Sequence, residues 1–448
     1  MSHHRDCRRT TRRRHRRGCH PWRMRMRLPA GRRSRRRSTA AAGALRNLLG
    51  GLLGPDITGT RQSLAALTVS SVTATGAGVL LAGITGTLER LPGLLVLVPA
   101  AIGMRGNIFG ALGSRLATLI HTGTFRLTTR PDTVVGQNIA AASVLTLVTA
   151  VVLGLLTKLL APMFGLEDVI SVADLLVVSA VAAVLSSVVV LVVTLGLAAG
   201  STRNDWDLDN VSAPVISAVG DVVTLPALLV GGALVGLPVA TPALAALATV
   251  GGAATLAWGW RRGRPALQQI LRESLPVLIG TGVMLVIAGV VIEHRLDTFV
   301  RHRAVLILLP ACLATAGAIG GILSGRLSTK LHLGVIEPAA LPPRGARRDL
   351  LFGFTLAGPI FVLNGGLAHL AALALGLSTP GLWRIVAIAL IGGLLATALA
   401  AAIAYYGAAF ANRLGFDPDT LSIPLVTSSV DLGGAAALVL AVGWVGLS

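Results

Sequence analysis

Long apolar segments separated by short polar loops cover the chain from residue 63 to residue 446. The hydrocarbon core of a membrane is about 30 Å thick, and about 20 apolar helical residues cross it. The apolar runs are continuous rather than alternating, which argues against an outer-membrane β-barrel. We therefore expect an all-α polytopic membrane protein. The pattern predicts eleven transmembrane helices, at residues 63–88, 92–120, 134–160, 170–199, 210–238, 241–260, 273–292, 304–324, 349–376, 381–411 and 421–446.

Comparison of the chain with itself reveals an internal repeat. Residues 99–123, PAAIGMRGNIFGALGSRLATLIHTG, match residues 310–334, PACLATAGAIGGILSGRLSTKLHLG, at an offset of 211. A second block at 207–225, DLDNVSAPVISAVGDVVTL, matches residues 417–435, DPDTLSIPLVTSSVDLGGA, at an offset of 210. Because two separated blocks share one order and nearly one offset, the chain is interpreted as a tandem duplication.

The number of spans in each copy decides how the copies are oriented. Each copy holds five predicted spans, so a direct fusion would invert the second copy in the membrane, and the unmatched span at 241–260 restores the parity. We therefore expect two parallel five-helix repeats about a pseudo-twofold axis along the membrane normal, unlike inverted-repeat transporters. Such a chain is a pseudo-dimer on its own, which is compatible with a monomer. The expected divisions are a tail at 1–46, a first repeat at 47–240, a linker helix with a basic loop at 241–272 and a second repeat at 273–448.

Composition and charge narrow the class of protein. Of the 448 residues, 53% are apolar and 13% are charged, and the mean hydropathy is +0.76, which excludes a soluble enzyme. A net charge of +20 is also typical of nucleic-acid binders, but residues 1–46 alone hold 17 Arg and one Asp. Since the rest of the chain is nearly neutral, we expect no nucleic-acid partner.

The arginine-rich tail has no apolar period and is predicted to be disordered. It would tether the protein to anionic membrane lipids on the cytoplasmic face; alternatively, translation begins at Met24 or Met26 or later and shortens it. With the tail inside, thirteen Lys and Arg fall in cytoplasmic loops and four in outer loops. This excess predicts a multi-pass protein of the cell membrane with its amino terminus in the cytoplasm and its carboxyl terminus outside.

Two carboxylates inside predicted spans are the leading candidates for chemistry. Asp221 and Asp431 occupy equivalent places in the fifth helix of each repeat, 12 residues after Asp209 and Asp419, or about 18 Å along a helix and near the membrane midplane. Intramembrane Asp is costly and marks functional sites. The alternative is that each Asp only hydrogen-bonds a neighbouring helix. Hydroxyl and proline positions share a helical face with each Asp: Pro214 and Ser217 in the first copy, Pro424 and Thr427 in the second.

These groups form a set of hard oxygen ligands. Two carboxylates on a pseudo-twofold axis, with hydroxyls and the carbonyls that proline leaves free, suit a divalent cation, above all Mg²⁺ with part of its water shell. Mg²⁺ would then be the transported ion, and no cofactor is expected. The acidic residues at the start of the two fifth helices either cap those helices or form a vestibule that concentrates cations. They are Asp207 and Asp209 in the first copy and Asp417 and Asp419 in the second.

The other repeated block is rich in glycine. The small and polar residues from Gly103 to Asn107 interrupt the second span, where the pattern predicts a break or a kink. Asn107 could offer its side-chain oxygen to the ion, but the equivalent residue in the second copy is Ala318. Arg115 and Arg326, near the inner ends of the equivalent helices, are expected to extend toward lipid headgroups.

The two blocks resemble the MgtE family of magnesium channels and transporters, in the two-domain form of solute carrier family 41 and its prokaryotic relatives. The resemblance rests on Gly103-x-x-Gly106-Asn107 followed by Ser114-Arg115-Leu116-x-Thr118, on its second copy, and on the D-x-DN-x₃-P-x₅-GD and D-P-D-x₄-P-x₆-D motifs. It implies a transporter rather than an enzyme, with Mg²⁺ passing along an axis lined by the second and fifth helices of each repeat. It also implies that Asp221 and Asp431 bind hydrated Mg²⁺. Because residues 1–62 are short, we expect no regulatory domain before the first repeat.

Two other functions compete with this one. A Na⁺- or H⁺-coupled exchanger of divalent cations would carry the same residues. The sequence NDWDLD at 204–209 also resembles the Asp-rich motif with which intramembrane prenyltransferases hold a diphosphate through Mg²⁺. The equivalent FDPDT segment at 416–420 lacks the leading Asn-Asp, and that chemistry has no use for the pair of mid-helix carboxylates.

Overall fold

The computed structural model of the chain confirms an all-α polytopic membrane protein. Within its described residues, 57–166, 168–204, 208–332, 334–414 and 418–447, there is no strand, and eleven helices are long and apolar enough to cross a membrane. The first six are α2 (Ile57–Gly83), α4 (Leu94–His121), α5 (Val134–Met163), α6 (Val172–Asn204), α7 (Leu208–Ala233) and α8 (Ala240–Arg262). The other five are α9 (Pro265–Glu293), α11 (Arg303–His332), α12 (Arg344–Ala374), α13 (Leu382–Leu414) and α14 (Pro418–Trp444).

Two short helices, which the apolar pattern did not predict, occupy equivalent places in the two repeats, at the offset of 211 residues. They are α3 (Thr85–Arg90), before α4, and α10 (Leu296–Arg301), before α11. The equivalent helices α4 and α11 also end alike, two residues before Gly123 and Gly334, whose φ angles are 68° and 66°. A left-handed residue at this place lets the chain turn away from the helix, and glycine adopts that conformation without strain.

Of the break or kink expected in the second span, the break is wrong: α4 runs without interruption through Gly103 and Asn107. Inside a membrane no water is available for backbone groups that a broken helix leaves unpaired, so an unbroken helix is favoured wherever packing permits it. Gly103 instead lets Leu285 of α9 and Asp431 of α14 approach α4, and the side chain of Asn107 bonds to other helices.

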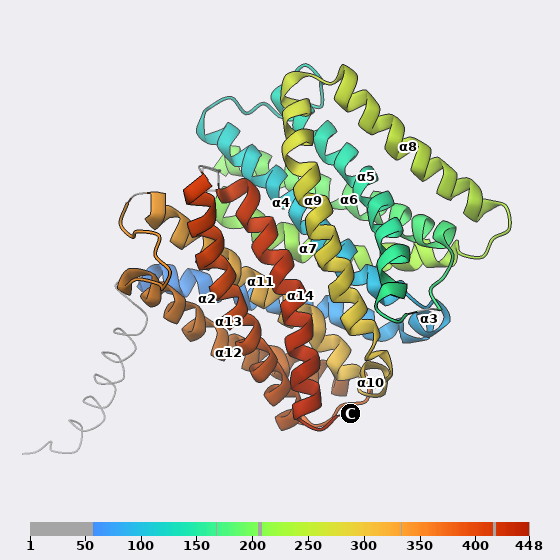
Figure 1. Cartoon of the computed structure of the whole chain (residues 1–448), viewed down its shortest axis with the longest axis vertical. Helices are drawn as coiled ribbons and strands as arrows, with labels where there is room; N and C mark the ends of the chain where they lie inside the picture. The colour runs from blue at the N-terminus through green and yellow to red at the C-terminus, as the bar shows by residue number, and fades with distance from the viewer. Residues whose placement is uncertain (1–56, 167, 205–207, 333, 415–417, 448) are drawn as a thin grey trace, which may run out of the picture. The chain divides into compact units, whose positions relative to one another are not determined.

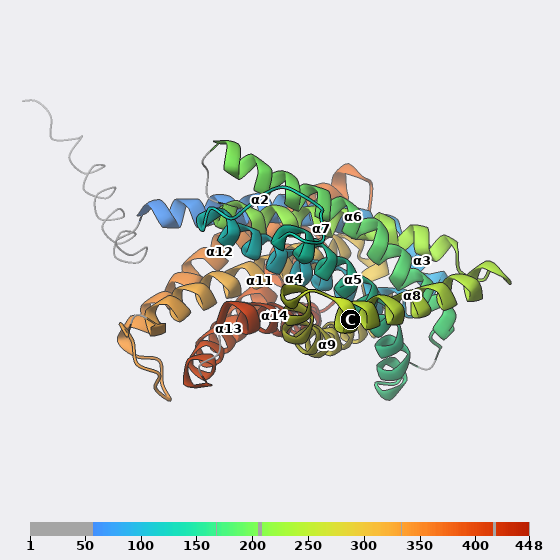
Figure 2. The same cartoon turned by 90° about the horizontal axis from the view of Figure 1, so that it is seen from above.

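Equivalent helices of the two repeats make equivalent contacts. In the first repeat α7 packs on α4 and α6, and in the second α14 packs on α11 and α13. The helix α5 packs on α4 and α6 just as α12 packs on α11 and α13. Figures 1 and 2 show the helices of the first repeat from blue to green and those of the second from yellow to red.

The first helix of each repeat lies against the other repeat. The helix α2 packs on α11 and α12, and its equivalent α9 packs on α4 and α5, while each also contacts the fifth helix of its own repeat. The closest approaches are equivalent too. A Cβ on Gly78 would overlap the backbone of Ile307, and a Cβ on Gly289 would overlap the backbone of Val96. These pairs are related by the offset of 211, so both copies exchange their first helix in the same way.

The unmatched helix α8 lies at the edge of the bundle in both views. It packs mainly on α5 and α6, and only 17% of its apolar segment is buried inside the protein. Its last turns expose Trp258 and Trp260, followed by Arg261 and Arg262, which is the composition that membrane interfaces favour. In the described part of the chain, five long helices precede α8 and α9 follows it. Because α8 adds a sixth crossing of the membrane, α2 and α9 cross the membrane in the same direction.

The glycine contacts predict where the bundle tolerates no side chain. Gly78→Ala places a methyl group on the backbone of Ile307, so we expect destabilisation of about 1–3 kcal/mol. Gly76→Ala, two residues earlier on α2, meets nothing within 4 Å and should leave stability unchanged or slightly raised. Thermal unfolding of the purified variants in detergent measures the difference. Equal melting temperatures for the two variants would contradict the close approach of α2 and α11.

Candidate functional site

The structure brings the two predicted intramembrane carboxylates near each other. Asp221 lies on α7 and is 6% exposed, and Asp431 lies half-buried on α14. The two carboxyl groups are close enough to repel each other when both are ionised. On α4, a Cβ added to Gly103 would lie 3.4 Å from Oδ2 of Asp431, so the missing side chain lets α4 approach this carboxylate. Figure 1 shows α4 and α14 in the centre of the bundle.

Asn107 joins three helices beside the carboxylates. Its Nδ2 donates to Oγ of Ser428 on α14 at 3.2 Å and to Oγ1 of Thr281 on α9 at 3.5 Å. Thr427 donates from Oγ1 to Oδ1 of Asn107 at 3.4 Å. The oxygen that was predicted to face the ion therefore accepts a hydrogen bond from a second predicted residue. This network depends on the exchange of first helices, because α9 belongs to the second repeat and α4 to the first.

A small cavity of about 20 Å³ adjoins this network. It is about large enough for one water molecule. Asn107, Arg115 and Ser274 supply its polar groups, and Arg115 donates from Nη2 to Oγ of Ser274 at 3.2 Å. Arg115 was expected to extend toward headgroups, but it is half-buried between α4 and α9.

A second polar network joins α2, the first helix of the first repeat, to α11 and α12 of the second repeat. Asn364 on α12 donates from Nδ2 to Oγ1 of Thr315 on α11 at 2.9 Å and to the carbonyl of Ala311 at 3.1 Å. The hydroxyls of Thr315 and Ser71 on α2 are 3.3 Å apart. The sequence pattern predicted none of these residues, nor Thr281 and Ser428 of the first network. Ser71 and Thr281 reach their partners only through the exchange of first helices.

Part of the predicted ligand set lies outside what the structure describes. Asp207 and Asp417 fall outside the described residues. Asp209 and Asp419 belong to the first turns of α7 and α14, but the structure describes nothing of their side chains. The acidic vestibule therefore stays a prediction. Ser217 is half-buried on α7, about one turn before Asp221.

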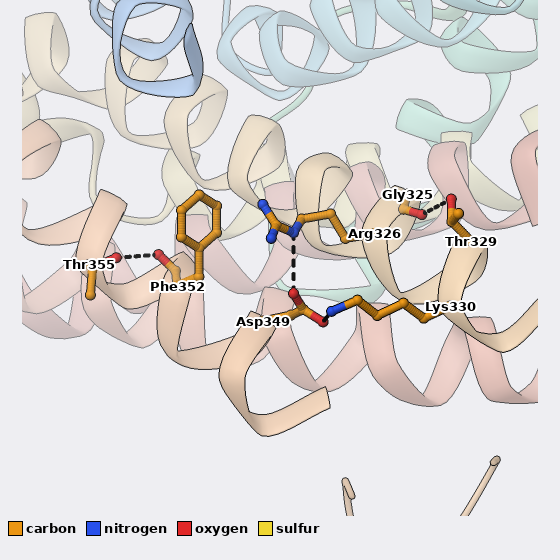
Figure 3. A network of polar contacts seen from close by, with 7 residues as sticks. All are labelled: Gly325, Arg326, Thr329, Lys330, Asp349, Phe352 and Thr355. Carbon is orange, nitrogen blue, oxygen red and sulfur yellow. Dashed lines mark hydrogen bonds and ion pairs between the residues drawn. The ribbon is translucent and has the colours of Figure 1, made fainter. Parts of the chain in front are cut away.

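A second charged cluster ties α11 to α12, away from the carboxylate pair (Figure 3). Asp349 on α12, whose side chain is 3% exposed, pairs with Nε of Arg326 at 3.2 Å and with Nζ of Lys330 at 2.5 Å. The guanidinium of Arg326 also lies over the ring of Phe352, 4.4 Å from its centre. Arg326 was expected to extend toward headgroups, but Asp349 holds it. The residue equivalent to Asp349 in the first repeat is Asn138, so this cluster belongs to one repeat only.

The fold and this geometry define a class: a polytopic membrane protein built from a duplicated five-helix unit with acidic residues inside the membrane. Residues 98–231 and 309–441, one stretch in each repeat, match the family model of MgtE, a divalent cation transporter. The chain belongs to the MgtE family and is a divalent cation transporter.

Members of solute carrier family 41 are similar over most of the chain. Member 3 from Rattus norvegicus is 24% identical over 398 residues, which cover 82% of this chain and 84% of that protein. Member 2 from Mus musculus is 28% identical over 373 residues, or 78% of this chain and 63% of that protein. Member 2 from Homo sapiens is 27% identical over 380 residues, or 79% of this chain and 64% of that protein. The chain thus spans somewhat under two thirds of the length of these two member 2 proteins.

The cluster around Asp349 predicts a specific loss of stability. Asp349→Asn leaves Arg326 and Lys330 without their carboxylate, and because both cations are partly exposed we expect a loss of about 1–3 kcal/mol. Lys330→Gln keeps the pair with Arg326 and should cost less. Thermal unfolding in detergent gives the order of the two variants. A greater loss in Lys330→Gln would contradict Asp349 as the centre of the cluster.

Proposed function

We propose that Mg²⁺ crosses the membrane along a path between the two repeats and binds at Asp221 and Asp431. The observation that carries this proposal is the duplication: the same carboxylate stands at the same place on α7 and on α14, and the two are near enough for their charges to interact. Two like charges held together inside a membrane are strongly unfavourable without a cation, and a divalent ion balances both.

The ligand chemistry favours Mg²⁺ that keeps much of its water. Mg²⁺ prefers oxygen ligands, dehydrates reluctantly and is usually bound in proteins through one or two carboxylates. The hydroxyl of Thr427 and the amide of Asn107 bond to each other, which suits them to hold water molecules around the ion rather than to replace them. The member 2 and member 3 relatives are named only as solute carriers, so the identity of the ion rests on this chemistry and on the resemblance.

The remaining features fit a path that opens to the cytoplasm. Asp207, Asp209, Asp417 and Asp419 precede the two fifth helices and would concentrate cations at that end. The excess of Lys and Arg in the loops on the same side favours a cytoplasmic position for this end and for the amino terminus. Since one chain carries both repeats, a monomer suffices for the path.

The carboxylates are tested by Mg²⁺ flux into liposomes. We expect Asp221→Asn and Asp431→Asn each to lower the flux about tenfold or more, because each removes one of the charges that offset the ion's dehydration. The double variant should carry no flux above empty liposomes. Asp297→Asn, the same substitution at an exposed residue of α10, is the matched control and should keep wild-type flux. Flux that survives in the double variant would overturn the assignment.

The coupling of transport is tested in the same liposomes. A path that only conducts Mg²⁺ should carry flux down the Mg²⁺ gradient with no Na⁺ or pH gradient present. An exchanger should need an opposing Na⁺ or H⁺ gradient, and its flux should reverse when that gradient is reversed. Measurement with each gradient imposed singly distinguishes the two, and a strict requirement for Na⁺ or H⁺ would contradict simple conduction.

A further inference from the structure

Arg105 is a charged side chain buried inside the membrane-spanning helix α4. It is 1% exposed and is among the largest fully buried side chains of the described residues. Its Nη1 donates to Oγ of Ser186 on α6 at 3.1 Å, and its Nε is buried with no hydrogen-bond partner within the described part of the chain. The residue lies 11 positions into a helix of 28, far from either end.

Among the described residues, no carboxylate forms an ion pair with this guanidinium. In the part of the chain that the structure describes, ion pairs within 4.0 Å join only Asp349 to Arg326 and Lys330. A guanidinium is not deprotonated in proteins, so it carries its charge even at this depth. An unpaired charge in the membrane interior is unfavourable and marks a function by default. The equivalent residue in the second repeat is the apolar Ala316, so the packing of the fold does not itself require an arginine here.

The Cβ of Arg105 lies against α7, the helix that carries Asp221. A Cβ on Gly220 would lie 3.7 Å from Cβ of Arg105, and Gly220 directly precedes Asp221 on α7. On α4 itself, Gly103 stands two residues before Arg105 and faces Asp431. The guanidinium is bonded to Ser186 on α6 and makes no ion pair with either carboxylate, but charges that are not in contact still interact in a medium of low dielectric constant.

We propose that Arg105 is a fixed positive charge that weakens the binding of a divalent cation between Asp221 and Asp431 and so lets the ion leave the site. The inference rests on the proposed function of those two carboxylates. A path conducts only if its site attracts the ion enough to admit it and releases it fast enough to pass it on. Two carboxylates without a nearby cation would hold Mg²⁺ tightly, and Arg105 offsets part of that attraction. A divalent ion feels this repulsion twice as strongly as a monovalent one.

The first test replaces the charge. In liposome flux assays, Arg105→Gln should lower the half-saturating Mg²⁺ concentration about fivefold or more and also lower the maximal flux, because the ion binds tighter and leaves more slowly. Arg105→Lys keeps the charge and should keep a half-saturating concentration near that of wild type. A role limited to packing α4 against α6 would lower the flux without moving the half-saturating concentration.

The second test keeps Arg105 and compensates its positive charge with a negative charge on a neighbouring side chain. Ser186→Asp puts a carboxylate beside the guanidinium and should shift the half-saturating Mg²⁺ concentration in the same direction as Arg105→Gln. Ser186→Asn has almost the same shape without the charge and should behave as wild type. If Arg105→Gln does not fold, the Ser186 pair decides alone, and equal half-saturating concentrations for Ser186→Asp and Ser186→Asn would overturn the proposal.

The two proposals fail in different ways. Full flux in the double Asn variant of Asp221 and Asp431 would refute the carboxylate site itself. An inactive double variant together with an unchanged half-saturating concentration in Arg105→Gln and Ser186→Asp would refute only the role of Arg105.

Discussion

A membrane interior offers no water to a polar group, so each polar side chain there must be satisfied by another helix or by an ion. In this protein many hydroxyls bond to a carbonyl of their own helix, as Thr75 and Thr149 do, while several polar side chains near the carboxylates bond across the two repeats. The helices α2 and α9 each lie in the opposite repeat, and there Ser71 meets Thr315 while Thr281 meets Asn107. The region around the carboxylates is consequently built by both repeats together, with α9 and α14 on one side and α4 and α7 on the other.

The duplication sets the backbone alike in both repeats, but the polar side chains differ. Asn107 has Ala318 as its equivalent, and Arg105 has Ala316. Asp349, which pairs with Arg326 and Lys330, has Asn138 as its equivalent in the first repeat. A homodimer of single repeats cannot vary one side of its axis without the other, whereas a fused chain can. The asymmetry is concentrated on α4, the helix that carries both Arg105 and Asn107 beside a symmetric pair of aspartates.

Much of this architecture was predictable from the sequence, for clear physical reasons. Spanning a membrane requires long apolar helices, so hydropathy located all eleven, and the duplication located Asp221 and Asp431. The exchange of first helices was not predictable from hydropathy, since a helix is equally apolar against either repeat. Its one sequence signal is a glycine at the same place in both copies, Gly78 and Gly289. Thr281, the partner of Asn107 on α9, was missed for the same reason. The break expected at Gly103 was wrong because packing on other helices, not composition, decides whether such a helix stays continuous.

The exchange of helices also bears on how the chain is made. When α9 emerges during synthesis, its neighbours α4 and α5 already exist, so it can dock at once. The helix α2 has no such advantage, because α11 begins 220 residues after the last residue of α2. Until then its glycine-bearing face has only lipid or α7 for a neighbour, and contacts of such long sequence separation form late and slowly. The first membrane-spanning helix among the described residues is therefore among the last to reach its final place.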